Sequence, residues 1–192
     1  MEATFFFDPA CPWTWHTSRW LTTVAAARDV TVHWRAFSLA ILNEGAVPEQ
    51  FRATMEASAQ ALRLVEALRA DGRRDDVGRF YTAMGARSHE LNVPLNQEAV
   101  LEAADAAGIT DAKRVLDDPA WDEAVRESHR TAMAAAGPDI GSPVLMVDDA
   151  PRGLHGPIIS EAPDEAAAEQ LWDAILPLLR SPVFFEVKRG RR

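Results

Sequence analysis

The chain has 192 residues, 47% of them hydrophobic, and carries a formal net charge of −9 because 29 acidic side chains outnumber 20 basic ones. This length suits one domain, or one domain with an insertion, and the acidic balance argues against nucleic acid as a partner. The sequence has no stretch of about 18 apolar residues and no signal-peptide pattern at its start, so we expect no membrane span.

The first three elements read as strand, helix, strand. Residues 3–7 are short, apolar and aromatic, as in a buried strand. Residues 12–27 place apolar side chains at helical spacing, and residues 30–37 alternate apolar with polar side chains, as a strand does. A unit of this length predicts two parallel strands joined by a crossover helix.

The middle of the chain, residues 43–137, has a helical pattern throughout. We predict helices from Pro48 to a charged break at 69–76, then at 77–88, 95–107 and 119–136. The block is too long for a crossover and too helical for a loop, so we interpret it as an inserted helical lid domain.

The last part of the chain returns to strands. Residues 144–147 and 153–156 read as two strands joined by a hairpin turn. Residues 164–179 follow as an amphipathic helix.

The chain contains one cysteine, Cys11, placed between the first strand and the first helix. Unpaired N–H groups and the helix dipole at this position favour the thiolate, which is the reactive form. Pro12 suits the first helical position because its missing N–H costs nothing there. The sequence therefore predicts a nucleophile with a pKa below the roughly 8.5 of a free thiol. The alternative is a buried cysteine that acts as a small hydrophobe.

Thr14 lies one turn after Cys11 on the same helical face. Its hydroxyl has two expected roles: it donates to the thiolate, or it bonds to the backbone at the helix start. A lone cysteine makes no internal disulfide, which fits a reducing cytoplasm. A thiol bound to Cys11 must then leave by attack from a second, external thiol.

Eight short stretches, in order along nearly the whole chain, resemble one family. They are Phe7-Asp8-Pro9-x-Cys11-Pro12-Trp13, Thr17-Ser18-Arg19-Trp20, Ser38-Leu39-Ala40-Ile41-Leu42-Asn43-Glu44, Tyr81-Thr82-Ala83-Met84-Gly85, Gly141-Ser142-Pro143, Gly156-Pro157, Leu171-Trp172-Asp173 and Phe184-Phe185-Glu186. Together they are similar to the actinobacterial mycothiol-dependent nitroreductases in the DsbA-like branch of the thioredoxin superfamily. In that branch the motif is Cys-x-x-Cys, whereas this chain reads Cys11-Pro12-Trp13-Thr14.

The resemblance implies an α/β thioredoxin-like fold, βαβ before and ββα after the insertion. Residues 1–42 and 138–192 would form the thioredoxin-like domain, and residues 43–137 the inserted helical domain. It also implies that Ser142 and Pro143 form the cis-proline loop facing the cysteine. The alternative for Pro143 is an ordinary trans proline before an edge strand.

We therefore expect a cytoplasmic, monothiol oxidoreductase in which Cys11 and Thr14 are catalytic. Pro12, Trp13, Ser142 and Pro143 would bind substrate or thiol, and His155 is a weaker candidate for the same role. By the resemblance, mycothiol is the cosubstrate, and the substrate is a disulfide or a small electrophile such as a nitro compound. We expect no tightly bound cofactor and no metal, since the histidines lack paired ligand spacing.

Two other functions stay open from the sequence. One is a thiol transferase or isomerase like the kappa-class glutathione transferases, in which a hydroxyl activates a bound thiol. The other is a redox-inactive module that binds a partner through a thioredoxin fold. The sequence also leaves open whether the protein forms a homodimer.

Overall fold

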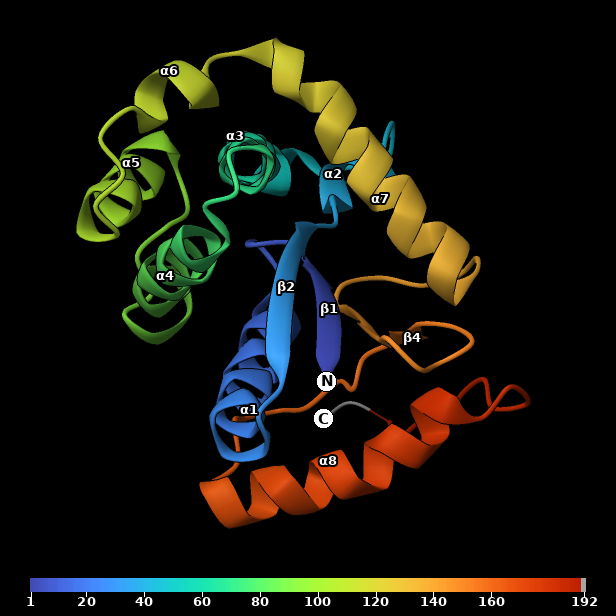
Figure 1. The fold of residues 1–192 in the computed structure, drawn as a ribbon. Coiled ribbons are helices and arrows are strands. Elements are labelled where there is room, and N and C mark those ends of the chain that lie inside the picture. The colour runs from blue at the N-terminus through green and yellow to red at the C-terminus, as the bar shows by residue number, and fades with distance from the viewer. Residues whose placement is uncertain (191–192) are drawn as a thin grey trace.

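Four strands form one sheet in the order β2-β1-β3-β4 (Figure 1). They span Glu2–Phe7 (β1), Thr31–Ala36 (β2), Val144–Val147 (β3) and Leu154–His155 (β4). The computed structural model describes residues 1–190, so Arg191 and Arg192 of the predicted 138–192 segment lie outside the described residues.

The strand pairing confirms the predicted parallel unit. β1 runs parallel to β2, with Glu2 opposite Thr31 and Phe7 opposite Ala36. β3 runs antiparallel to both β1 and β4. Helix α1 (Pro12–Arg28) is the crossover between β1 and β2. This arrangement, with helix α8 (Glu165–Arg180) closing the chain, is the expected βαβ and ββα of a thioredoxin-like fold.

Strand β1 is buried on both faces, which is why its sequence is a continuous apolar run. Phe5 and Phe7 pack in the larger core cluster with residues of α1, α4 and α8. Phe6 points to the opposite face and packs with Ala132 of helix α7 (Asp122–Ala136). Cys11 follows the end of this strand, whose last three residues are fully buried.

The helices between β2 and β3 form the insertion. They are α2 (Leu39–Leu42), α3 (Arg52–Ala70), α4 (Arg74–Gly85), α5 (Gln97–Ala106), α6 (Ala112–Leu116) and α7, with short 3-10 turns at Glu49–Phe51 and Pro119–Trp121 and a π-helical turn at Ala86–Glu90. Helices α3 and α4 lie beside β2 (Figure 1). The boundaries 43 and 137 of the insertion as a separate domain stay a prediction.

Two short helices were not expected from the sequence. Ser38 is the N-cap of helix α2, and its hydroxyl accepts a hydrogen bond from the Ile41 N–H at 3.2 Å. Helix α6 spans only Ala112–Leu116. Helices of one turn show too little periodicity to be recognised. The charged break predicted at 69–76 is also shorter in the structure, because α3 continues to Ala70 and α4 begins at Arg74.

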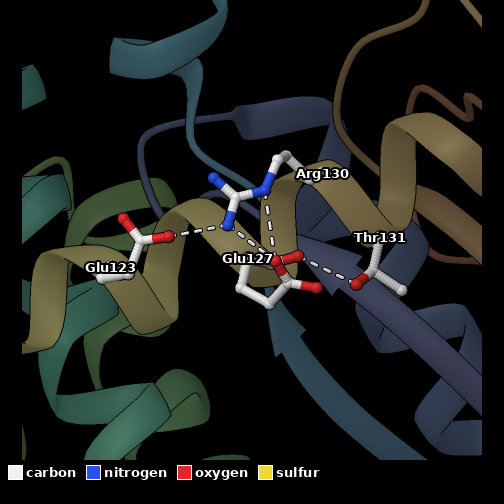
Figure 2. A network of polar contacts seen from close by, with 4 residues as sticks. All are labelled: Glu123, Glu127, Arg130 and Thr131. Carbon is white, nitrogen blue, oxygen red and sulfur yellow. Dashed lines mark hydrogen bonds and ion pairs between the residues drawn. The ribbon is translucent and has the colours of Figure 1, made fainter.

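The outward face of α7 is polar and charged. Arg130 contacts Glu123 and Glu127 at 2.7 and 2.6 Å, and the Thr131 hydroxyl donates to the Glu127 backbone carbonyl (Figure 2). Exposed ion pairs of this kind add little stability, but they identify the solvent side of the helix. Among residues 1–190, no helix is both long and apolar enough to cross a membrane.

The buried carboxylate of Asp8 joins the strand end to the insertion. It accepts hydrogen bonds from the Ala10 N–H at 2.8 Å, the Leu39 N–H at 2.6 Å and the Ser58 hydroxyl at 2.6 Å. Leu39 begins α2, and Ser58 belongs to α3. Burial raises the pKa of Asp8 above its ordinary value, and the three donors reduce this rise without reversing it. One side chain thus fixes the loop before Cys11 to two helices of the insertion.

Replacing Ser58 with alanine removes one donor from this buried carboxylate. We expect Ser58→Ala to lower the free energy of unfolding at pH 7 by about 2 kcal/mol, as a hydrogen bond to a charged group does. The control is Ser128→Ala, since the buried Ser128 hydroxyl has no hydrogen-bond partner among the described residues. Urea unfolding measures both variants, and equal losses would contradict the role given to Ser58.

Candidate active site

Cys11 lies between the end of β1 and the start of α1. It is the N-cap of α1, with φ −90° and ψ 112°, and Pro12 takes the first helical position. Its backbone N–H donates to the Asp8 carbonyl at 3.1 Å. The side chain is only 7% exposed. Cys11 therefore lies at the helix N-terminus, as the sequence predicted, and its thiol is buried.

The loop before β3 lies against the thiol. The Ser142–Pro143 peptide bond is cis. The Cys11 thiol points at the Ser142 carbonyl, with 3.6 Å between sulfur and oxygen. The Thr14 and Ser142 hydroxyl oxygens are 2.8 Å apart. The structure thus brings Cys11, Thr14, Ser142 and Pro143 together, although Cys11 and Ser142 are far apart in the chain.

The hydroxyl of Ser142 also receives the Asp8 N–H, at 2.9 Å. With that bond in place, Ser142 can donate its own proton to Thr14 Oγ1. The Thr14 hydroxyl proton is then available to the sulfur of Cys11, and this hydrogen bond favours the thiolate. When Ser142 donates to Thr14, the backbone of Asp8 orients a short chain of hydroxyls that ends at the thiol.

Burial nevertheless raises the pKa of the Cys11 thiol, and the charge of Asp8 raises it further. The Thr14 hydroxyl and the N–H groups of Thr14 and Trp13 act in the opposite direction without reversing the shift. The sequence-based prediction of a lowered pKa is wrong for this reason. The helix N-terminus does favour the thiolate, but the loss of solvent around the sulfur outweighs it.

The tryptophans of the motif have different surroundings. Trp13 is half-buried, next to the thiol in sequence, while Trp15 and Trp20 are buried. Trp15 packs edge-on to Tyr81 with ring centroids 5.8 Å apart, and the Arg19 guanidinium lies 4.1 Å from the Trp15 ring. Trp20 packs against Trp172 of α8. Of the three, Trp13 is the one whose ring is partly open to solvent at this turn.

Sequence reasoning missed His89. This residue lies in the π-helical turn after α4, and its Nε2 hydrogen-bonds to the Pro9 carbonyl at 2.8 Å. Its ring stacks on Trp15 with centroids 6.0 Å apart. Burial lowers the pKa of His89, so the neutral ring with its proton on Nε2 is favoured. No local signal marks it, because its partner Pro9 lies 80 residues earlier in the chain.

His155 lies on β4 opposite Val144, and its side chain is exposed. A Cβ placed on Gly141 would be 3.4 Å from the His155 Nε2, so the ring lies beside the start of the cis-proline loop. Its role in binding thiol or substrate stays a prediction. Among residues 1–190, no group of three or more His, Cys, Asp or Glu side chains is arranged to hold a metal ion.

Comparison with known proteins shows which family this chain belongs to. The family described as "Mycothiol-dependent nitroreductase Rv2466c" matches residues 10–189. The chain is 31% identical to the uncharacterised protein Rv2286c of Mycobacterium tuberculosis over 97% of this chain and 81% of that protein.

Solved structures show the same fold at lower identity. A 2-hydroxychromene-2-carboxylate isomerase superposes with a TM-score of 0.61 at 16% identity, covering 94% of this chain and 97% of its own. A probable DsbA oxidoreductase, SCO1869 from Streptomyces coelicolor, gives 0.57 at 23% identity, covering 99% and 94%. The chain therefore belongs to the Rv2466c-like family of mycothiol-dependent nitroreductases, thiol oxidoreductases with a DsbA-like thioredoxin fold.

Proposed function

We propose that this protein is a monothiol reductase in which Cys11 is the nucleophile and a low-molecular-weight thiol, mycothiol, is the cosubstrate. The observation that carries the proposal is the Thr14 hydroxyl standing beside the only thiol, where a dithiol enzyme has its second cysteine. A hydroxyl can stabilise a thiolate, but it cannot attack a disulfide.

The reaction proceeds in two exchanges. Cys11 loses its proton and its thiolate attacks one sulfur of a substrate–mycothiol disulfide, which forms a disulfide between Cys11 and mycothiol and releases the substrate as a thiolate that takes up a proton. A second mycothiol thiolate then attacks the mycothiol sulfur of that disulfide. Cys11 leaves as a thiolate that takes up a proton, and the two electrons given up by mycothiol remain on the reduced substrate, while mycothiol leaves as its oxidised disulfide. For a nitro substrate, two thiols supply the two electrons and two protons that give the nitroso compound and water.

The raised pKa of Cys11 favours this direction of electron flow. A thiol whose thiolate is strongly stabilised makes an oxidising protein, because its reduced form is favoured. Cys11 has the opposite balance, since burial and the charge of Asp8 raise its pKa. A thiolate of high basicity is also a strong nucleophile and a slow leaving group. At neutral pH the raised pKa also leaves little of the thiol ionised, so we expect capture of a substrate sulfur to speed up as the pH rises, and release by the second thiol to be slow.

The Ser142 carbonyl and the cis-proline loop would receive the incoming thiol. The carbonyl is 3.6 Å from the Cys11 sulfur, so a ligand bound along this loop places its own sulfur within reach. We propose that Trp13 and His155 lie on either side of this loop and form the entrance to the site. Pro12, at the start of α1, would form another part of this entrance.

A second function is favoured by the Thr14–Ser142 pair. Two hydroxyl oxygens 2.8 Å apart could bind and activate the thiol of a bound cosubstrate, as in a thiol transferase or isomerase. Cys11 would then be dispensable. A Cys11→Ala protein that keeps turnover with mycothiol would establish this function and overturn the monothiol mechanism.

The alkylation rate of Cys11 should depend on pH in the way expected for a thiol whose pKa is raised. With iodoacetamide the rate should rise with pH to a midpoint above the roughly 8.5 of a free thiol, because only the thiolate reacts. Thr14→Val should move this midpoint higher, since it removes a donor to the sulfur. The control Thr22→Val, further along α1, should leave it unchanged. A wild-type midpoint below the free value would show that the helix N-terminus dominates.

Intact mass spectrometry tests the monothiol cycle directly. The protein is incubated with mycothiol disulfide, glutathione disulfide and cystine in separate samples. We expect one adduct per chain, formed fastest with mycothiol, which persists until reduced mycothiol is added. Cys11→Ser should give none. An unmodified wild-type protein would instead favour the redox-inactive binding module.

Thr14→Cys should convert the site to a dithiol one. Residues 11 and 14 are one helical turn apart, and the Thr14 side chain already lies at the Cys11 thiol. The variant should lose two hydrogens in mass on oxidation and should release a bound thiol without a second equivalent. A variant that never closes this disulfide under oxidising conditions would contradict the proposed geometry of the turn.

A further inference from the structure

A cavity of about 290 Å³ lies at the outer edge of β2, where α3 ends and α4 begins. Three arginines line it, each from a different element: Arg35 from β2, Arg69 from α3 and Arg74 from α4. None of the residues placed in the active site contributes to its wall. We call it the arginine cavity.

The positive charge of the arginine cavity is only partly neutralised. Arg69 pairs with Glu66, with 2.7 Å between Nε and Oε2, and the other oxygen of Glu66 accepts the Ala36 N–H at 3.1 Å. Among residues 1–190, Arg35 and Arg74 form no ion pair with any acidic side chain. The cavity therefore has three guanidinium groups and one neighbouring carboxylate, that of Glu66, whose two oxygens already have hydrogen-bond partners.

Two nearby acidic side chains are engaged elsewhere, whereas the exposed Asp75, next to Arg74 in the sequence, forms no ion pair among residues 1–190. Glu127 interacts electrostatically with Arg35, but its carboxylate is held by Arg130 on α7 (Figure 2). Asp76, two residues after Arg74, pairs with Arg73 and Arg79. The surplus charge is thus a property of the cavity itself, in a protein whose net charge is −9.

Arg35 carries the clearest sign of a missing partner. Its Nε is buried and has no hydrogen-bond partner among the described residues. Its guanidinium lies over the Phe6 ring, 5.1 Å from the centroid, which fixes its position. Burial lowers the pKa of Arg35, so its charge is poorly solvated. Because Arg35 lines the cavity, an anion bound there would offset this poorly solvated positive charge.

Neutral polar groups also lie along this edge of β2, although the Ala36 N–H is already bonded to Glu66. The Ala36 N–H points away from β1, toward Glu66, and the two-residue repeat of a strand turns the Trp34 N–H to the same edge. Thr4 adds a hydroxyl to the wall, and His33, paired with Glu2, stands beside it. The first turn of α4, whose N-cap Arg73 provides no side-chain cap, also borders the cavity.

We propose that the arginine cavity binds a small dianionic oxyanion of the phosphate class, either inorganic phosphate or the phosphate group of a small monoester. Guanidinium groups match the oxygens of phosphate in bidentate geometry. Arginines that approach from three elements suit a tetrahedral anion better than a planar carboxylate. The volume is at the lower end of ligand pockets, which suits a compact ligand.

Isothermal titration calorimetry of the full chain tests the proposal. The titrants are inorganic phosphate, glycerol 3-phosphate and malonate, each at the same ionic strength set with sodium chloride. We expect saturable binding of phosphate at one site, with malonate weaker. Tighter binding of glycerol 3-phosphate than of phosphate would identify a monoester as the ligand, and the reverse would identify the free ion.

Two variants locate the site. Arg74→Gln, at an exposed position, should weaken phosphate binding about tenfold, the loss of one charge-assisted contact. Arg79→Gln, on the same helix but outside the cavity wall, changes the net charge equally and should leave the affinity unchanged. Cys11→Ala should also bind phosphate normally, which separates this test from that of the catalytic proposal. The proposal would be overturned if phosphate binding did not saturate. It would also be overturned if both arginine variants weakened phosphate binding equally, or if malonate bound more tightly than phosphate.

Discussion

The buried carboxylate of Asp8 is the interaction on which the rest of the structure depends. It receives two backbone N–H groups and the Ser58 hydroxyl, and so it holds β1, α2 and α3 at one point. Its own backbone N–H holds the Ser142 hydroxyl and thereby the loop before β3. The thioredoxin-like segments and the insertion meet at this residue, three positions before the only cysteine.

The same residue also acts on the pKa of the thiol, in which burial has the largest effect. Asp8 is fully buried, and its charge raises the pKa of Cys11 in addition to the effect of burial. Thr14 opposes both, through a hydroxyl that Asp8 itself orients by way of Ser142. The Asp8 carboxylate therefore has two effects: it holds the turn before Cys11 in place, and its charge favours the thiol of Cys11 over the thiolate.

The sequence predicted the parts of the fold that local patterns determine. Strand β1, helix α1 and helix α8 have a clear period and clear ends, and the structure has them within a few residues of the expected bounds. Helices α2 and α6 were missed because one turn gives no period. The direction of the Cys11 pKa shift was wrong because the burial of the sulfur comes from segments distant in sequence, which no local pattern records. His89 escaped notice for the same reason, as its contact with Pro9 exists only in the folded chain.

Packing between α1 and α4 shows that the insertion is more than a cover for the site. A side-chain carbon on Gly85 would lie 2.2 Å from the Trp15 ring, so only glycine allows this approach. One turn earlier Tyr81 stacks on Phe7, with ring centroids 4.0 Å apart. Trp15 follows Cys11 by one turn and Phe7 ends β1, so α4 packs directly against the two elements that position the thiol. A motion of α4 as a lid would open these contacts and release the thiol from its surroundings. Access to Cys11 is therefore better sought along the Ser142 loop, whose carbonyl already faces the sulfur.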